Sequence, residues 1–135
     1  MYCSPINIFL SHAWDIDSLG NATHFRAQML NSGLKQLGWK VWFDEEMLIP
    51  GCNIDSEMAR GIEQSDVICL CITRRYIDKI NSQRHDDNCV KEFNLMFVSG
   101  KRILPLILER EMLDPRVWPS GVAQMYLINT FYIDF

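Results

Sequence analysis

Short apolar runs alternate along the chain with longer amphipathic stretches. The apolar runs predict five buried β-strands, at residues 6–11, 40–44, 66–72, 102–108 and 130–135. The third run, DVICLCI, is apolar on both faces, which is typical of a parallel strand covered by helices on each side. Pro105 lies inside the fourth run and cannot donate a ladder hydrogen bond, so it predicts a bulge or a position near the sheet edge.

The stretches between these runs carry apolar residues at helical spacing. We predict one helix from a cap at Asn21 to about Leu37, one that follows a cap at Asn53, and one from Asn88 that ends before Gly100. The buried stripe of the first helix is expected to contain Phe25, Met29, Leu30, Leu34 and Leu37. Residues 79–87, KINSQRHDD, are predicted to form a polar loop.

Alternating strands and helices indicate an α/β fold with a parallel sheet and right-handed crossovers. The 135 residues suffice for a single domain that spans 1–135. Ligands of such sheets bind beyond the carboxyl ends of the strands. The segments after the first three strands and the loop before Cys89 should therefore converge on one crevice.

The segment FDEEMLIPGCN, residues 43–53, joins the second strand to the second helix. It carries three acids, then the apolar Met47, Leu48 and Ile49, then the pair Pro50 and Gly51. An apolar cluster on a loop beside a crevice is typical of a contact surface. The alternative is that these three side chains fold back onto the domain.

Composition excludes some classes of function. The net charge of −4, with no basic run, argues against a nucleic-acid partner, and no apolar run is long enough to span a bilayer. Five cysteines without framework spacing indicate free thiols in a reducing compartment, so we predict a cytoplasmic protein without a membrane partner. No His or Cys spacing typical of a metal site is found, so no metal is predicted.

Several segments, in order, resemble a TIR domain (Toll/interleukin-1 receptor homology domain) of the bacterial or protist type. IFLSHAW at 8–14 resembles the first box of the family, residues 34–73 resemble the second strand through the third, and NCVKEF is similar to the motif W-C-x-x-E. The resemblance implies a flavodoxin-like three-layer fold with five parallel strands in the order 2-1-3-4-5. It identifies residues 43–53 with the BB loop, which docks onto other TIR domains.

The family usually has a further helix after the fifth strand, and we expect this chain to lack it. One face of the sheet near strands 4 and 5 would then be bare, to be covered by a further segment of a longer protein or by a partner.

Some TIR domains hydrolyse NAD⁺ at the bond between nicotinamide and ribose, with a glutamate that corresponds to Glu92. Nicotinamide leaves as a neutral pyridine, so no general acid is needed, and a fixed carboxylate can stabilise the cationic transition state. The resemblance further implies substrate contacts from Ser11, His12, Ala13, Trp14, Asp44 and Cys89. NAD⁺ would be a substrate, and no cofactor is expected.

We therefore predict an NAD⁺ hydrolase activated by homotypic TIR–TIR self-association in innate-immune or stress signalling. The alternative is a signalling adaptor without enzymatic activity, which assembles through the BB loop. Asn88 replaces the tryptophan of the motif, which favours the adaptor. From position alone, Glu92 could also serve only the first turn of its helix. Cys89 as a nucleophile is a weaker hypothesis, because only His85 is near it in sequence as a base.

Overall fold

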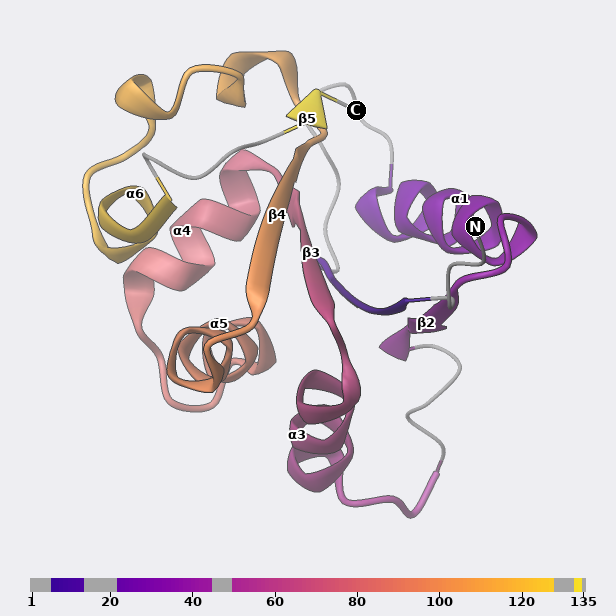
Figure 1. The fold of residues 1–135 in the computed structure, drawn as a ribbon. Helices are drawn as coiled ribbons and strands as arrows, with labels where there is room; N and C mark the ends of the chain where they lie inside the picture. Colours follow the sequence, from indigo (N-terminus) through magenta and orange to yellow (C-terminus); the bar gives the residue numbers. More distant parts are fainter. Residues whose placement is uncertain (1–5, 14–21, 45–49, 128–132, 135) are drawn as a thin grey trace.

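A parallel sheet forms the centre of the molecule. The computed structural model describes residues 6–13, 22–44, 50–127 and 133–134. Within them, β1 (Asn7–Ser11), β2 (Lys40–Trp42), β3 (Val67–Ile72) and β4 (Arg102–Ile107) pair in parallel in the order β2-β1-β3-β4 (Figure 1). This order confirms the prediction for these four strands.

The β4 edge of the sheet carries one further short pairing. β5 (Ile133–Asp134) lies parallel to β4, with Leu106 opposite Ile133 and Ile107 opposite Asp134. The rest of the strand predicted at 130–135 lies outside the described residues. β4 pairs with β3 in unbroken register, so Pro105 causes no bulge there, and it lies outside the residues that pair with β5. Its predicted place near the sheet edge is confirmed.

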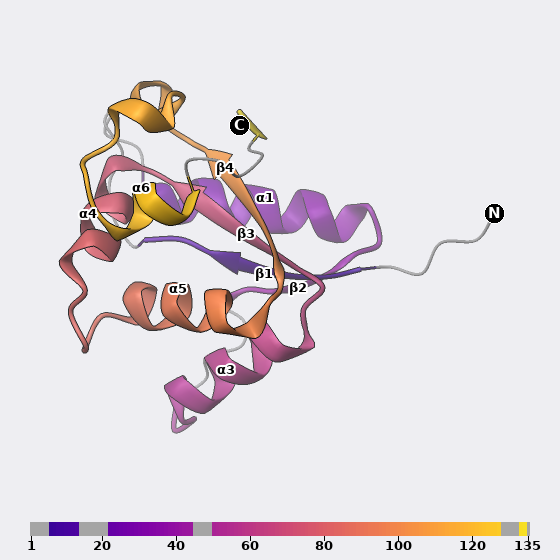
Figure 2. The same cartoon turned by 60° about the vertical axis from the view of Figure 1, so that its left-hand side comes forward.

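Helices cover the two faces of the sheet unequally. Of the described helices, α1 (Thr23–Gln36) covers one face, while α3 (Ile54–Gln64), α4 (Arg74–Ser82), α5 (Asn88–Ser99) and α6 (Val122–Leu127) lie on the other (Figures 1 and 2). Two 3₁₀ turns, η1 (Arg110–Met112) and η2 (Pro115–Val117), connect β4 to α6. None of the described helices is long and apolar enough to cross a bilayer.

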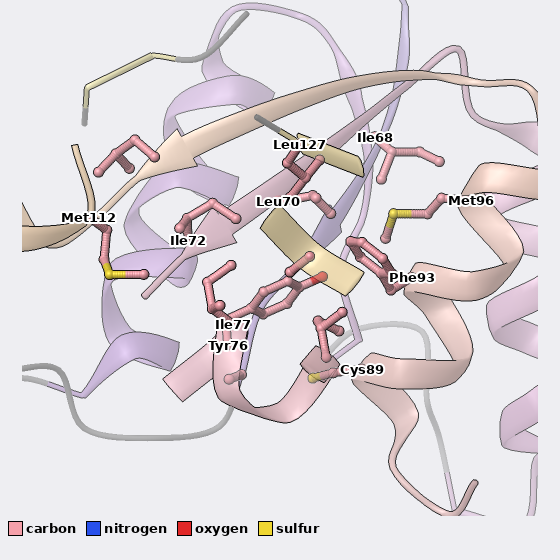
Figure 3. Close-up of a cluster of buried hydrophobic side chains, with 14 of the residues drawn as sticks. Ile68, Leu70, Ile72, Tyr76, Ile77, Cys89, Phe93, Met96, Met112 and Leu127 are labelled. Carbon is pink, nitrogen blue, oxygen red and sulfur yellow. The ribbon is translucent and has the colours of Figure 1, made fainter. Parts of the chain in front are cut away.

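The larger core lies between the sheet and the four helices on its second face. Figure 3 shows Ile68, Leu70 and Ile72 of β3 facing Tyr76 and Ile77 of α4 and Phe93 and Met96 of α5. All seven side chains are fully buried. The smaller core, on the α1 face, contains Ile8, Leu10, Ala27, Val41, Phe43, Cys69, Cys71, Leu106 and Leu108.

Helix α4 corrects the predicted polar loop at 79–87, whose first four residues are helical. The Thr73 hydroxyl accepts a hydrogen bond from the backbone N–H of Tyr76 and so caps the helix. Tyr76, Ile77 and Ile80 form one buried stripe, and the polar residues that predicted a loop occupy the solvent-facing side.

The predicted buried stripe of α1 was wrong in part. Phe25, Met29 and Leu37 are 60%, 59% and 69% exposed, whereas Thr23, Ala27 and Asn31 are buried. The helix therefore turns small side chains toward the sheet, which lets its backbone approach closely. Leu30 and Leu34 are half-buried, and the N-cap position is Ala22, since Asn21 lies outside the described residues.

An apolar groove of about 750 Å³ lies beside α1 on the same face of the sheet. Its lining includes Leu30 and Leu34 of α1 and Ile103 and Leu104 of β4. Across the described residues, the sheet is thus less completely covered here than on its other face.

Candidate functional site

Glu92 is held at the carboxyl edge of the sheet by the start of α5. The side chain of Asp87 caps this helix, accepting from the backbone N–H of Cys89 at 2.8 Å. One turn later, Glu92 points inward and is only 8% exposed. Ser11, the last residue of β1, donates its hydroxyl to Oε2 of Glu92 at 2.7 Å.

Tyr76 extends this pair into a buried hydrogen-bonded chain. Its hydroxyl lies 3.0 Å from Oγ of Ser11, and both side chains are buried. Because Ser11 donates its single hydroxyl proton to Glu92, the Tyr76 hydroxyl donates to Ser11. Burial, followed by electrostatic contributions from Cys89 and Glu92, raises the pKa of Tyr76 well above its usual value, so Tyr76 keeps its proton.

Burial also controls the ionisation of Glu92. The pKa of Glu92 is raised to about 8, mainly by desolvation and further by the charges of Asp44 and Asp87, while the hydrogen bond from Ser11 acts in the opposite direction. The carboxyl group is therefore mostly neutral at pH 7 in the unliganded protein. A cation brought against it would favour the ionised form and be stabilised in turn.

A small pocket between α3 and α5 reaches Glu92. It has a volume of about 160 Å³ and an apolar wall of Met58, Ala59, Ile62 and Leu95. The ion pair of Lys91 and Asp55, 3.1 Å between Nζ and Oδ1, belongs to its rim. Small-molecule sites commonly measure ~300–1,000 Å³, so the pocket can take one aromatic ring and not a whole dinucleotide.

His12 and Asp44 lie together beside this centre, as the predicted crevice requires. Nε2 of His12 is 2.6 Å from Nδ1 of His24, at the start of α1. His12, His24 and Asp44 each offer one possible metal-ligand atom, and these three atoms lie within 4.8 Å of one another. These three are the described residues that could hold a metal ion; the sequence spacing did not predict them.

The other predicted contacts have different surroundings. The thiol of Cys89 is 3.5 Å from the carbonyl oxygen of His12 and is buried. Ala13 is fully buried within the larger core, so its side chain presents no surface to a ligand. Asn88 is exposed at the first position of α5, where the family motif has tryptophan.

Part of the predicted site falls outside the described residues. Trp14, from the first-strand loop, and Met47, Leu48 and Ile49, from the BB loop, all belong to that part. Pro50 and Gly51 are described and lie exposed in a turn, with Gly51 at a φ of 85° that favours glycine.

Sequence reasoning missed Tyr76 and His24. For Tyr76 a signal existed, because Thr73 followed by Tyr76, Ile77 and Ile80 is the pattern of a capped helix with an apolar stripe. For His24 there was none, since only the fold brings the start of α1 to the end of β1.

Comparison with known families agrees with this geometry. The family profile described as the TIR domain matches residues 8–135. The fold and the site thus define an α/β domain of the flavodoxin-like class, and the chain belongs to the TIR domain family. A comparison with curated proteins gave no match. As a TIR domain, the chain is of a kind that generally interacts with other TIR domains.

Proposed function

We propose that this TIR domain hydrolyses NAD⁺ and that Glu92 is its catalytic residue. The observation that carries the proposal is the burial of Glu92 at the sheet edge: its carboxyl group is hydrogen-bonded to Ser11, and the residue belongs to the lining of a pocket of the size of one ring. A glutamate that only served the first turn of a helix would lie exposed at the surface. Perturbed carboxyl groups in clefts are typical of functional sites.

The chemistry suits a single carboxylate. The bond between C1′ of the ribose and the ring nitrogen breaks, and both electrons leave with nicotinamide, which becomes neutral. Water then adds to the oxocarbenium carbon and loses one proton, which gives ADP-ribose, nicotinamide and a proton. Glu92 stabilises the positive charge that moves from the pyridinium ring to the sugar.

Burial gives Glu92 a role specific to a cationic substrate. The neutral carboxyl group loses its proton when the pyridinium ring arrives, because the ring replaces the missing counter-charge. Ser11 donates to the carboxylate and, with Tyr76 behind it, fixes its direction. Both are positioning residues rather than catalytic ones.

Self-association supplies the second part of the proposal. The small pocket accommodates the nicotinamide end alone, so the remainder of the dinucleotide needs further surface. We propose that a second TIR domain, docked through the BB loop of residues 43–53, provides it. In this proposal, assembly couples the enzyme to innate-immune or stress signalling inside the cell.

An adaptor without activity is the second candidate, and Asn88 is the observation that favours it. An exposed asparagine replaces the aromatic residue of the motif, which removes stacking surface worth about 1 kcal/mol. An adaptor would keep assembly through the BB loop and need no ionised Glu92.

The test measures nicotinamide release from NAD⁺ at high protein concentration with a crowding agent. Wild type is compared with Glu92→Gln and with Glu63→Gln, a matched change at an exposed position of α3. We expect release by wild type and Glu63→Gln, with at least about a hundredfold loss in Glu92→Gln. Equal release by all three would reject Glu92. No release by assembled wild type would identify an adaptor.

A further inference from the structure

We propose that His12, His24 and Asp44 form a binding site for a divalent transition-metal ion of the zinc class. The three residues come from separate elements: the end of β1, the first turn of α1 and the residue that follows Phe43 after β2. The proposal concerns metal binding alone and does not depend on NAD⁺ hydrolysis.

The geometry of the imidazole nitrogens carries the proposal. Nε2 of His12 and Nδ1 of His24 are 2.6 Å apart and the ring centroids are 4.8 Å apart, so the two nitrogens face each other. Zinc–nitrogen bonds of ~2.0–2.1 Å in a tetrahedral site separate two ligand nitrogens by about 3.3 Å. A side-chain shift of less than about 1 Å, which rotation about χ angles provides, therefore opens the pair to an ion.

The carboxylate closes the third side. A carboxylate oxygen of Asp44 and one ring nitrogen of each histidine lie within 4.8 Å of one another, close enough for small side-chain movements to bring all three onto one ion. Two imidazoles and one carboxylate are a ligand set that zinc uses with three protein ligands, leaving the fourth position open. Magnesium and calcium prefer all-oxygen ligands, so this donor set favours the transition metals.

Phe43 supports both rings from one side. Its ring stacks on His12 at 5.5 Å between centroids and 21° between planes, and on His24 at 5.3 Å and 15°. Phe43 and His12 are buried, while His24 and Asp44 are half-buried, so the site has an apolar wall and an open side. An apolar shell that fixes ligand orientation is a common feature of protein metal sites.

The competing description is a plain hydrogen bond between the two histidines, with one ring donating and the other accepting. The two descriptions differ in a measurable way, since a hydrogen-bonded pair needs no metal and binds none selectively. His24 is the discriminating residue, because it is not among the predicted substrate contacts.

The test titrates the apo chain with Zn²⁺ by calorimetry and with Co²⁺ by visible absorption. Wild type is compared with His24→Gln and with His85→Gln, a matched change at an exposed loop position, all in a Cys52→Ser background that removes a half-buried thiol. Asp44→Asn provides a second variant, of nearly unchanged shape, in case His24→Gln does not fold.

We expect one ion per chain in wild type and His85→Gln, with affinity at least about tenfold weaker in His24→Gln and in Asp44→Asn. The Co²⁺ spectrum should show ligand-field bands without a thiolate charge-transfer band. Equal affinity in wild type, His24→Gln and Asp44→Asn would overturn the proposal, as would a thiolate band that persists in His24→Gln, because the ion would then sit on cysteine.

Discussion

Glu92 and its one hydroxyl donor illustrate how burial decides the state of a single residue. A carboxylate usually needs two or three donors or a cation to be stable inside a protein. Among the described contacts, Ser11 provides one donor, and Asp44 and Asp87 add negative charge nearby. The residue is therefore suited to bind a cation. When it ionises without one, the free energy of unfolding falls.

The first prediction concerns that cost. The pKa of Glu92 is about 8 in the folded state against 4.5 for an ordinary glutamate, so folding retains a proton that the unfolded chain releases. The stability due to this proton is complete below pH 4.5 and is lost as the pH rises toward 8. By pH 7 the loss is roughly 3 kcal/mol.

Glu92→Gln removes this titration, and its free energy of unfolding should fall less between pH 4.5 and 8 than that of wild type. Urea denaturation across that range measures the difference. Glu63→Gln, on the exposed side of α3, should follow the wild-type curve. Parallel curves for wild type and Glu92→Gln would mean that Glu92 is ionised in the folded protein.

The second prediction concerns activity. If Glu92 acts as a carboxylate, kcat/KM for NAD⁺ should rise about tenfold per pH unit below pH 8 and level off above it, because this ratio reports the free enzyme. The kcat profile should turn at lower pH, since the bound pyridinium favours ionisation. A kcat/KM that falls between pH 6 and 8 would contradict this role.

At the same scale, the sequence singled out Glu92 of the candidate site more readily than the residues around it. The spacing of the motif and the resemblance located Glu92, and the end of β1 located Ser11 and His12. Tyr76 and His24 escaped, because each meets the site through tertiary packing across 65 and 12 residues of sequence respectively. Local sequence patterns do not predict contacts between residues that are distant in the sequence.

At the scale of elements, β-strands were easier to predict than helix orientation. Runs such as 66–72 are apolar on both faces, so their side chains are expected to be buried whichever way the strand pairs with its neighbours. In helix α1 the predicted stripe was half right: Leu30 and Leu34 pack against the core, but Phe25 and Met29 are exposed, and the smaller Ala27 is buried instead. Large residues on a helix do not by themselves identify its buried face.

The third prediction uses two glycines inside helices. A Cβ on Gly61 of α3 would lie 2.6 Å from the Trp42 ring, which itself stacks on Phe9 at 4.5 Å. A Cβ on Gly33 of α1 would meet nothing within 4 Å. The helical benefit of alanine over glycine is about 1 kcal/mol in both places, but only Gly61 has a ring to displace.

Gly33→Ala should therefore stabilise the protein by up to about 1 kcal/mol, and Gly61→Ala should destabilise it by about 1–2 kcal/mol. Thermal unfolding of the two single variants measures both signs. A stabilising Gly61→Ala would mean that Trp42 moves aside without cost.

At the scale of the whole molecule, two features bear on the proposed docking of a second TIR domain. They are the unequal cover of the two sheet faces and the position of the candidate site at the carboxyl edge of the sheet. Sequence reasoning predicted the α/β layers and the strand order because alternation of elements limits the topology. The apolar groove of about 750 Å³ on the α1 face follows from the packing of α1 against the sheet, which the sequence did not predict correctly.

The fourth prediction tests assembly. If a second TIR domain completes the site, NAD⁺ turnover per chain should rise with protein concentration. Leu48→Glu, in the BB loop, should reduce the concentration-dependent increase in turnover at least about tenfold, because it would bury a charge in the contact between the two domains. Val98→Glu makes the same change at a position of α5 that is 80% exposed, and it should leave the rise intact. Turnover that is independent of concentration in wild type would show that the monomer is sufficient.

For the proposed hydrolysis of NAD⁺, the buried carboxyl group has a consequence for which form of the dinucleotide can react. NAD⁺ brings a pyridinium charge to Glu92, whereas NADH brings an uncharged dihydropyridine that leaves the carboxyl group protonated and unpaired. Cleavage of NADH would also have to expel the dihydropyridine as an anion, which is a far poorer leaving group than neutral nicotinamide. If the proposed hydrolysis of NAD⁺ holds, the domain would respond to the oxidised form alone, and its output would follow the redox balance of the nicotinamide pool as well as its size.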